Sequence, residues 1–308
     1  MRLSIITTMY YSAPYIEEFY RRSTAAAKQI TGDYEIVIVN DGSPDNAVDV
    51  AIRLHREDPK VKVIDLSRNF GHHKAMLCGL AHATGDEVFL IDCDLEESPE
   101  WVVEFHQQMS VEGCDVVYGV QARRKGHVFE RYSGAAFYAL VDHLGDFETT
   151  PNRTSAILMK RDYVRALNLF VEREPVFLGL SLLAGFDQRP RTVTKTSKDT
   201  TTYTLSRKIA TTVNMITAFS SKPLIYIFYV GMLIFVCSVA YSSWLLVNRL
   251  FFEKPLEGWT SVIMSIWVLG GMIISFVGVV GIYVSRIFVE TKQRPNVIVK
   301  RLFDSAES

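Results

Sequence analysis

The sequence predicts an α/β fold, with a mostly parallel, doubly wound sheet followed by a two-helix transmembrane hairpin. Over residues 1–205, short β-prone runs alternate with segments of helical character, an order typical of parallel sheets. Beyond residue 223, two long segments contain no charged side chain, as membrane spans require. Polar clusters follow three of the β-prone runs, which is where ligands of doubly wound sheets bind.

The predicted strands cover residues 3–8, 35–39, 61–66, 87–91 and 115–118. Segments of about 20–26 residues separate the first four runs, and each is long enough for a crossover helix. Helices are predicted over residues 14–30 and 45–57. Because parallel strands end at a common edge, we expect the polar clusters at residues 40–43, 67–71 and 92–94 to lie together.

Composition excludes several classes of protein. The 308-residue chain has a net charge of −1 and offers no basic surface for nucleic acid. Neither a dinucleotide-binding nor a P-loop glycine pattern is present, so any phosphate must be held by metal and cationic side chains. No signal peptide is expected at the amino terminus, which runs directly into a strand. Four cysteines without metal-ligand spacing are predicted to be reduced thiols: Cys78, Cys93, Cys114 and Cys237.

Two uncharged segments, 224–247 and 261–285, are predicted to cross a membrane. At about 1.5 Å per residue the first is about 36 Å long, against a hydrocarbon core of about 30 Å. The alternative is a pair of buried helices in a soluble core. Small residues on both segments permit close packing, so a homo-oligomer is one expectation. Basic residues flank the pair on its outer sides: Arg207, Lys208, Lys222, Arg286, Lys292, Arg294, Lys300 and Arg301. The positive-inside rule then places both termini in the cytoplasm and the loop 248–258 outside.

Residues 206–222 differ from the two spans. Apolar residues recur there at helical spacing among Ser, Thr and Lys, which predicts an amphipathic helix at the cytoplasmic membrane surface. A helix of the soluble domain is the alternative.

Asp92 and Asp94 stand one residue apart after an apolar run. In an extended backbone both carboxylates point to the same side, where they repel each other unless a divalent cation or a shared proton joins them. The pair therefore predicts a hard metal ion and a phosphate ligand, with plain surface charge as the alternative. Adjacent His72 and His73 are not expected to share one cation.

The segments 39–45, 66–71, 85–86 and 92–100, in this order, resemble the family 2 glycosyltransferases with the GT-A fold. Within that family the chain is similar to the polyprenyl-phosphate glycosyltransferases, which include dolichol-phosphate mannose synthases and bacterial undecaprenyl-phosphate glucosyltransferases. The likeness extends over the catalytic domain, the spans and the tail element 293–297.

The resemblance implies a single-sugar transfer from a nucleotide-diphosphate sugar to a polyprenyl phosphate, with inversion and with Mg²⁺ or Mn²⁺. It implies a donor site of Asp41, Asp92, Arg68 and Lys74, and metal ligation by Asp94 and Asp92. It also implies a cytoplasmic catalytic domain over 1–205, a hairpin over 223–289, a cytoplasmic tail over 290–308, and a place in the inner (plasma) membrane. The acceptor phosphate is already an anion near neutral pH, so its attack needs little or no general base.

Departures from the family pattern concern the acceptor side. The segment 155–159 stands where many relatives carry an Asp-Phe-Arg-Leu-like motif, and it lacks both the acid and the arginine. Asn152 and Arg153 are the available substitutes. They complete the predicted catalytic set with Asp94, and Arg153 is predicted to bind the lipid phosphate. Glu96-Glu97 replaces the usual Gln-Asp, and a positioning role for Glu97 is one interpretation. The residues predicted to hold lipid headgroups and the acceptor phosphate are Lys195, Lys198, Tyr203, Arg207 and Lys208. A solvated basic linker is the alternative for that group.

Two other functions stay open. A transferase that extends a lipid-linked glycan is less favoured, because processive synthases add spans and a Gln-x-x-Arg-Trp-like motif that this chain lacks. A catalytically silent membrane scaffold is the second alternative. The sequence does not identify the sugar, the nucleotide or the pathway.

Overall fold

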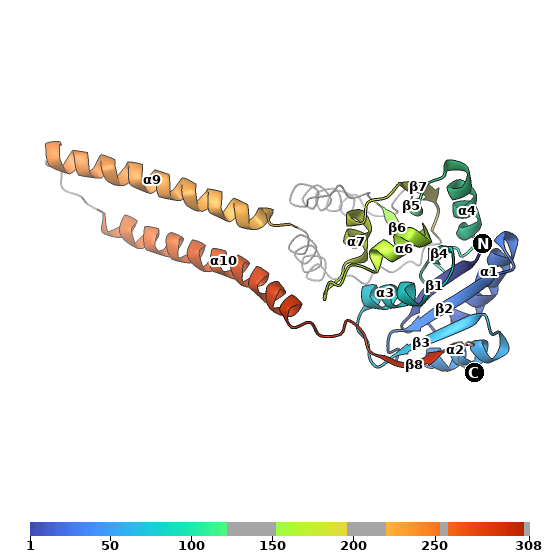
Figure 1. The fold of residues 1–308 in the computed structure, drawn as a ribbon. Coiled ribbons are helices and arrows are strands. Elements are labelled where there is room, and N and C mark those ends of the chain that lie inside the picture. The colour runs from blue at the N-terminus through green and yellow to red at the C-terminus, as the bar shows by residue number, and fades with distance from the viewer. Residues whose placement is uncertain (122–151, 196–219, 253–257, 305–308) are drawn as a thin grey trace. The chain divides into compact units, whose positions relative to one another are not determined.

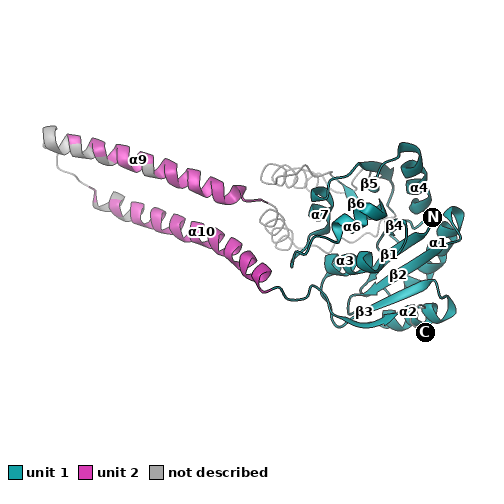
Figure 2. Ribbon diagram, viewed as in Figure 1, with its two compact units in different colours: residues 1–138, 149–204, 293–308 teal, residues 139–148, 205–292 magenta. Residues whose placement is uncertain are grey.

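The computed structural model describes residues 1–121, 152–195, 220–252 and 258–304 (Figure 1). The chain divides into two compact units (Figure 2). Residues 1–138, 149–204 and 293–308 form the first, which we call the sheet unit. Residues 139–148 and 205–292 form the second, the hairpin unit.

The described part of the sheet unit contains one eight-stranded sheet in the order β7-β5-β6-β4-β1-β2-β3-β8. The strands are β1 Leu3–Met9, β2 Tyr34–Asn40, β3 Val61–Leu66, β4 Glu87–Leu90, β5 Val116–Gln121, β6 Arg153–Lys160, β7 Gln188–Val193 and β8 Val299–Phe303. The four strands β4, β1, β2 and β3 are parallel neighbours in the middle, and β5 pairs parallel with β7. Strands β6 and β8 run antiparallel to their neighbours. The prediction of a mostly parallel α/β sheet is confirmed.

Helices follow the central strands as crossovers. The helices of this unit are α1 Ile16–Ile30, α2 Ala47–Glu57, α3 His72–His82, α4 Trp101–Glu112, α6 Arg161–Leu167 and α7 Phe177–Leu183. Strands β1 and β2 are buried along their whole lengths, as expected for central strands of a parallel sheet. The five predicted strands correspond to β1–β5, whereas β6, β7 and β8 were not predicted.

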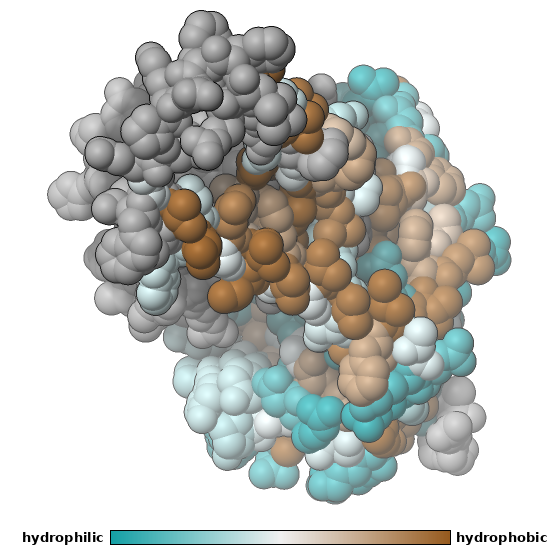
Figure 3. Space-filling view, turned by 90° about the vertical axis from the view of Figure 1, so that its left-hand side faces the viewer, coloured by the Kyte–Doolittle hydropathy of each residue, from teal (hydrophilic) through white to brown (hydrophobic). Residues whose placement is uncertain are grey.

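The hairpin unit consists largely of α9 Lys222–Phe252 and α10 Trp259–Thr291. Both helices include a segment with a mean hydropathy of 2.2 and no buried residues, long and apolar enough to cross a membrane. Hydrophobic surface is gathered on the face shown in Figure 3. Large apolar side chains on these helices are exposed, among them Leu233, Trp267 and Ile274. Most of the predicted interfacial segment 206–222 lies outside the described residues.

Candidate active site

The carboxyl ends of β1 to β4 lie at one edge of the sheet, because these strands are parallel neighbours. The loops that follow β2, β3 and β4 therefore meet at this edge. They carry the three polar clusters of the sequence. The candidate active site is built from these loops together with β6.

Asp41 ties two of these loops together. Its buried carboxylate accepts the backbone N–H of Phe70 at 2.7 Å and that of Gly71 at 3.1 Å. Burial raises the pKa of Asp41, and the two N–H groups oppose that rise. The described hydrogen bonds of the Asp41 carboxylate are thus with the 67–71 loop. That the Asp41 carboxylate accepts a hydrogen bond from the nucleotide-sugar donor stays a prediction.

The two predicted cationic donor ligands lie beside this loop. The exposed guanidinium of Arg68 stacks over the ring of Phe70 at 4.1 Å and donates to the carbonyl of Asn69 at 2.9 Å. Lys74 lies in the first turn of α3 and is partly buried. No ion pair joins Arg68 to a carboxylate among the described residues. Its charge is therefore available to a phosphate at this edge.

Asp92 is held by side chains from two other elements. The hydroxyl of Ser155, on β6, donates to one carboxylate oxygen at 2.7 Å. The other oxygen lies 3.3 Å from Nε2 of His72, whose Nδ1 is 3.0 Å from the hydroxyl of Thr8. That second oxygen of Asp92 is buried without a hydrogen-bond partner in the described chain. An orphaned carboxylate oxygen of this kind is suited to a cation.

Asp94 lies two residues further along the same loop. Its carboxylate accepts the backbone N–H of Glu96 at 3.0 Å, and Leu95 between them has a positive φ of 63°. A branched side chain in the left-handed region is strained backbone, which is concentrated at functional sites. The turn therefore fixes the position of the Asp94 carboxylate within the loop of residues 92–97.

Glu97 links the loop after β4 to β6 through hydrogen bonds. Its fully buried carboxylate accepts the backbone N–H of Ser155 at 3.1 Å and that of Ala156 at 2.6 Å. The ammonium of Lys195 lies 2.6 Å from the same carboxylate. Burial opposes the charged form of Lys195, but Glu97 outweighs it and raises the pKa of Lys195. Lys195 therefore forms an ion pair with a carboxylate of the site, a contact that no local sequence pattern predicts.

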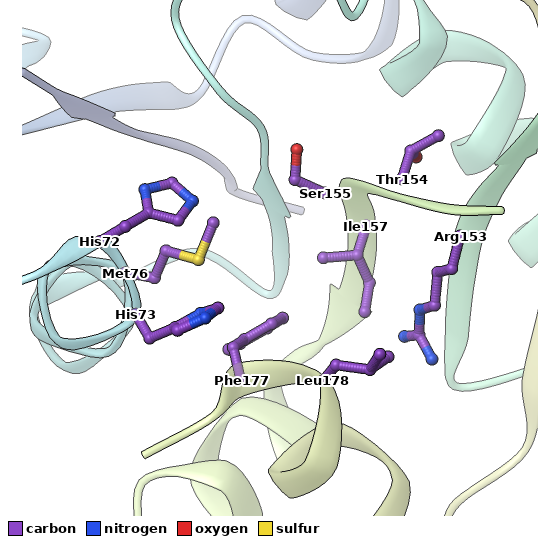
Figure 4. A pocket seen from close by; sticks show the side chains of 9 residues that line it. All are labelled: His72, His73, Met76, Arg153, Thr154, Ser155, Ile157, Phe177 and Leu178. Carbon is purple, nitrogen blue, oxygen red and sulfur yellow. The ribbon is translucent and has the colours of Figure 1, made fainter. Parts of the chain in front are cut away.

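A cavity of about 180 Å³ lies next to Ser155. Figure 4 shows the side chains that line it from α3, β6 and α7: His72, His73, Met76, Arg153, Thr154, Ser155, Ile157, Phe177 and Leu178. Four of these nine residues are apolar, and the polar ones are an arginine, two histidines, a threonine and a serine. The cavity is thus suited to a ligand that combines an anion with a hydrocarbon group.

Arg153 is the cation of this cavity. Its guanidinium stacks 3.9 Å over the ring of Tyr118 and donates to the Ser181 hydroxyl at 2.9 Å. Nη1 is buried without a partner, and no carboxylate pairs with Arg153 among the described residues. Burial lowers the pKa of Arg153 because no neighbouring acid compensates the charge. Since buried charges in proteins are normally paired, this guanidinium lacks an anion that a ligand can supply.

The remaining predicted site residues either do not line the cavity or lie outside the described residues. Asn152 has a positive φ of 61° in the turn before β6, and its carbonyl accepts the backbone N–H of Gln121 at 3.0 Å. It shapes the entry into β6 and does not line the cavity. Lys198, Tyr203, Arg207 and Lys208 lie outside the described residues.

The carboxylates fit a magnesium-type ion only in part. Among the described residues, no three His, Cys, Asp or Glu side chains form a group that could hold a metal. Mg²⁺, however, is often bound by one or two carboxylates together with substrate phosphates and water. The orphaned oxygen of Asp92 fits that type of site, in which the donor diphosphate supplies further ligands.

This sheet, with carboxylates at the carboxyl ends of its central strands, is a GT-A-like α/β domain. The sequence profile of Glycosyl transferase family 2 matches residues 4–167. A protein of Mycobacterium tuberculosis described as "Putative glycosyltransferases" is 52% identical over 305 residues, which is 99% of this chain and 89% of that protein. The chain belongs to glycosyl transferase family 2, and the predicted family is confirmed.

Two further comparisons give lower identity. The "Prophage bactoprenol glucosyl transferase homolog" of Escherichia coli is 29% identical over 317 residues, which cover 98% of this chain and 99% of that one. Among solved structures, S. aureus TarS 1-349 in complex with UDP-GlcNAc is 17% identical, with a TM-score of 0.46 over 71% of this chain and 66% of that chain.

Proposed function

We propose that this protein transfers one sugar from a nucleotide-diphosphate sugar to a polyprenyl phosphate at the cytoplasmic face of the membrane, with inversion. The observation that carries the proposal is the cavity beside Asp92, in which the buried guanidinium of Arg153 lacks a counter-ion. The name of the Escherichia coli relative, which includes bactoprenol, supports a polyprenyl acceptor. Two apolar helices in the same chain support a lipid substrate.

The donor is proposed to bind along the carboxyl edge of the sheet. Asp92 and Asp94 would hold Mg²⁺ or Mn²⁺, which neutralises the negative charge of the departing nucleoside diphosphate. Arg68 and Lys74 would contact the diphosphate from the 67–71 loop and the start of α3. Asp41 holds that loop in place through Phe70 and Gly71.

The acceptor phosphate is proposed to bind in the cavity, paired with Arg153. Met76, Ile157 and Phe177 provide an apolar wall against which the first isoprene units can pack. A phosphate oxygen attacks the anomeric carbon while the bond from that carbon to the diphosphate breaks, and the nucleoside diphosphate leaves. Because the attacking oxygen carries no proton near neutral pH, no residue of the chain has to act as general base.

The function is tested with the full chain in detergent, a panel of radiolabelled nucleotide sugars and undecaprenyl phosphate. We expect label in a mild-acid-labile lipid with at least one donor, and its loss with EDTA or in Asp94→Asn. Asp49→Asn, which changes an exposed aspartate on α2, is the control and should keep wild-type activity. Equal product from wild type and Asp94→Asn would contradict the metal assignment. Absence of transfer from every donor would overturn the proposed reaction and favour a silent scaffold.

Arg153→Gln tests the acceptor site in the same assay. Removal of a charged hydrogen bond to the acceptor phosphate should raise the acceptor KM by roughly tenfold or more, with the donor KM unchanged. Arg165→Gln is the matched control, because it removes an exposed arginine of α6 that lies outside the cavity. If Arg153→Gln changed both KM values equally, the cavity would not be the acceptor site.

A further inference from the structure

The last strand of the sheet comes from the chain that follows the hairpin. Strand β8 pairs antiparallel with β3, with Val63 opposite Phe303 and Leu66 opposite Val299. The backbone carbonyl of Ile298, just before β8, accepts the N–H of Ser67 at 2.9 Å. The residues after α10 thus contact the loop that carries Arg68 and is held by Asp41.

A chain of polar contacts leads from β8 to the loop after β2. Arg301 donates from Nε at 3.0 Å and from Nη2 at 2.9 Å to one carboxylate oxygen of Asp65. The other oxygen of Asp65 accepts the side-chain amide of Asn40 at 2.8 Å. The amide oxygen of Asn40 in turn accepts the backbone N–H of Ser43 at 3.1 Å. Asp65 and Asn40 are both buried, so the contact between them lacks competition from water, whereas Arg301 reaches Asp65 from the exposed surface of β8.

The contacts from Arg301 end at Asn40 and Ser43, which lie at and just after the carboxyl end of β2. Asn40 is the last residue of β2 and immediately precedes Asp41. Ser43 also accepts the backbone N–H of Tyr11, from the loop after β1, at 2.7 Å. Two loops at the carboxyl edge of the sheet, those after β1 and β2, are therefore connected through Asp65 to an arginine of the C-terminal strand.

We propose that β8 positions the donor-binding loops, and that Arg301 is a positioning residue for nucleotide binding through Asp65 and Asn40. The proposal rests on the proposed function, in which these loops bind the nucleotide-sugar donor. Without Arg301, the buried carboxylate of Asp65 keeps Asn40 as its one side-chain partner among the described residues, and the Asn40 amide can rotate away from Ser43. The 40–43 loop then loses its fixed conformation while the rest of the sheet keeps its pairing.

The chain offers a matched control. Asp304 pairs with Lys62 at 2.9 Å and so forms a second ion pair between the β8 end of the chain and β3. Lys62, however, lies near the amino end of β3 and also contacts Glu35 at 3.1 Å, away from the candidate active site. Loss of either pair weakens the attachment of β8, but only the pair of Arg301 and Asp65 leads to Asn40.

The test measures binding of UDP and of GDP, each with Mg²⁺, to the full chain in detergent by calorimetry. Arg301→Gln should weaken binding of the preferred nucleotide by about five- to tenfold, whereas Asp304→Asn should leave it within about twofold of wild type. In Asn40→Ala, which already lacks the contact with Asp65, the additional Arg301→Gln change should have no further effect on nucleotide affinity. Thermal unfolding of each variant shows whether the fold is retained.

The outcomes separate the two proposals. Equal nucleotide affinity in wild type and Arg301→Gln would overturn the positioning role and leave the proposed function intact. Equal weakening in Arg301→Gln and Asp304→Asn would also overturn it, because attachment of β8 alone would then explain the effect. Additive losses in the double variant of Asn40 and Arg301 would contradict the route through Asn40. A wild-type protein that binds neither UDP nor GDP would overturn the positioning role for these nucleotides, and the transfer assay with the donor panel would then decide the proposed function.

Discussion

Gly42 occupies a position at the candidate active site where a side chain does not fit. Its φ is +63°, in the left-handed region that glycine adopts without steric cost. A Cβ atom at this position would overlap the backbone of Arg68 and Asn69. The close approach of these two loops therefore depends on a missing side chain, and Asp41 next to it adds the hydrogen bonds that hold the loops together.

Gly42→Ala should destabilise the protein and weaken nucleotide binding. A non-glycine residue held at this φ costs roughly 1–3 kcal/mol, and the overlap with the 67–71 loop adds to that cost. Thermal unfolding and UDP binding of the purified variant measure the two effects. Gly32→Ala is the matched control, because Gly32 has open space around it and no positive φ. An equal effect of the two substitutions would show that loss of glycine, rather than the position, is responsible.

At the residue scale, the sequence predicts which side chains carry the chemistry better than it predicts their partners. Asp92 and Asp94 follow a short apolar run, and the repulsion of like charges points to a cation between them. The strand ends at Leu90, however, so the alternation of an extended backbone, on which the prediction of a common side rests, does not apply to them. The partner of Asp92 is Ser155, which lies 63 residues away in the chain. The ion pair between Lys195 and Glu97 likewise joins residues that are far apart in the chain. Such contacts arise from strand pairing, which no local pattern determines.

At the scale of elements, the predicted strands are those with a simple hydrophobic signal. Central strands such as β1 and β2 are buried on both faces and appear as continuous apolar runs. Strand β8 has two basic residues among five and is largely exposed, so its sequence gives no such signal. It becomes a strand because the edge of β3 offers unpaired backbone groups, a property of the folded sheet and not of residues 299–303 alone.

A buried carboxylate joins several elements at the opposite, amino end of the sheet. Glu35, on β2, accepts the hydroxyl of Ser4 on β1 at 2.6 Å and the N–H and hydroxyl of Thr84 at 2.6 and 2.8 Å. Lys62 on β3 lies 3.1 Å away. Burial opposes ionisation of Glu35, but these hydrogen bonds outweigh it and lower the pKa of the carboxyl. The negative charge of Glu35 thus stabilises the packing of three strands.

Glu35→Gln should reduce the loss of stability that accompanies acidification. The pKa of Glu35 in the fold is below its value in the unfolded chain, about 4.3, so its contribution is complete above that pH. The contribution is lost as the pH falls through the lowered pKa of the folded state. Midpoints of thermal unfolding measured from about pH 6 down to about pH 3 should therefore fall less in Glu35→Gln than in wild type. Glu57→Gln, at the exposed end of α2, serves as control, and identical pH profiles for both variants would contradict the assignment.

At the scale of the whole molecule, the hairpin is an insertion in the sequence of the sheet unit. Strand β7 precedes α9 in the chain and β8 follows α10, yet both strands belong to one sheet. A sheet cannot form across a bilayer, so a chain whose α9 and α10 cross a membrane must enter and leave it on the same side. This requires an even number of crossings, in agreement with two helices. Lysine and arginine are more numerous on the outer flanks of the two apolar segments than in the loop that joins them, and this favours the cytoplasm as that side.

Cysteine labelling in intact cells tests this topology. In a chain with Cys237→Ser, which removes the exposed thiol of α9, Glu257→Cys should react with a membrane-impermeant maleimide before the cells are permeabilised. Lys300→Cys, on β8, should react only after permeabilisation, because β8 shares the sheet with strands on the cytoplasmic side. Lysed cells give the full reactivity of each position and exclude a buried thiol. Labelling of Lys300→Cys in intact cells would contradict the cytoplasmic assignment of the sheet. Protection of both positions in intact cells would show that α9 and α10 do not carry the connecting loop across the membrane.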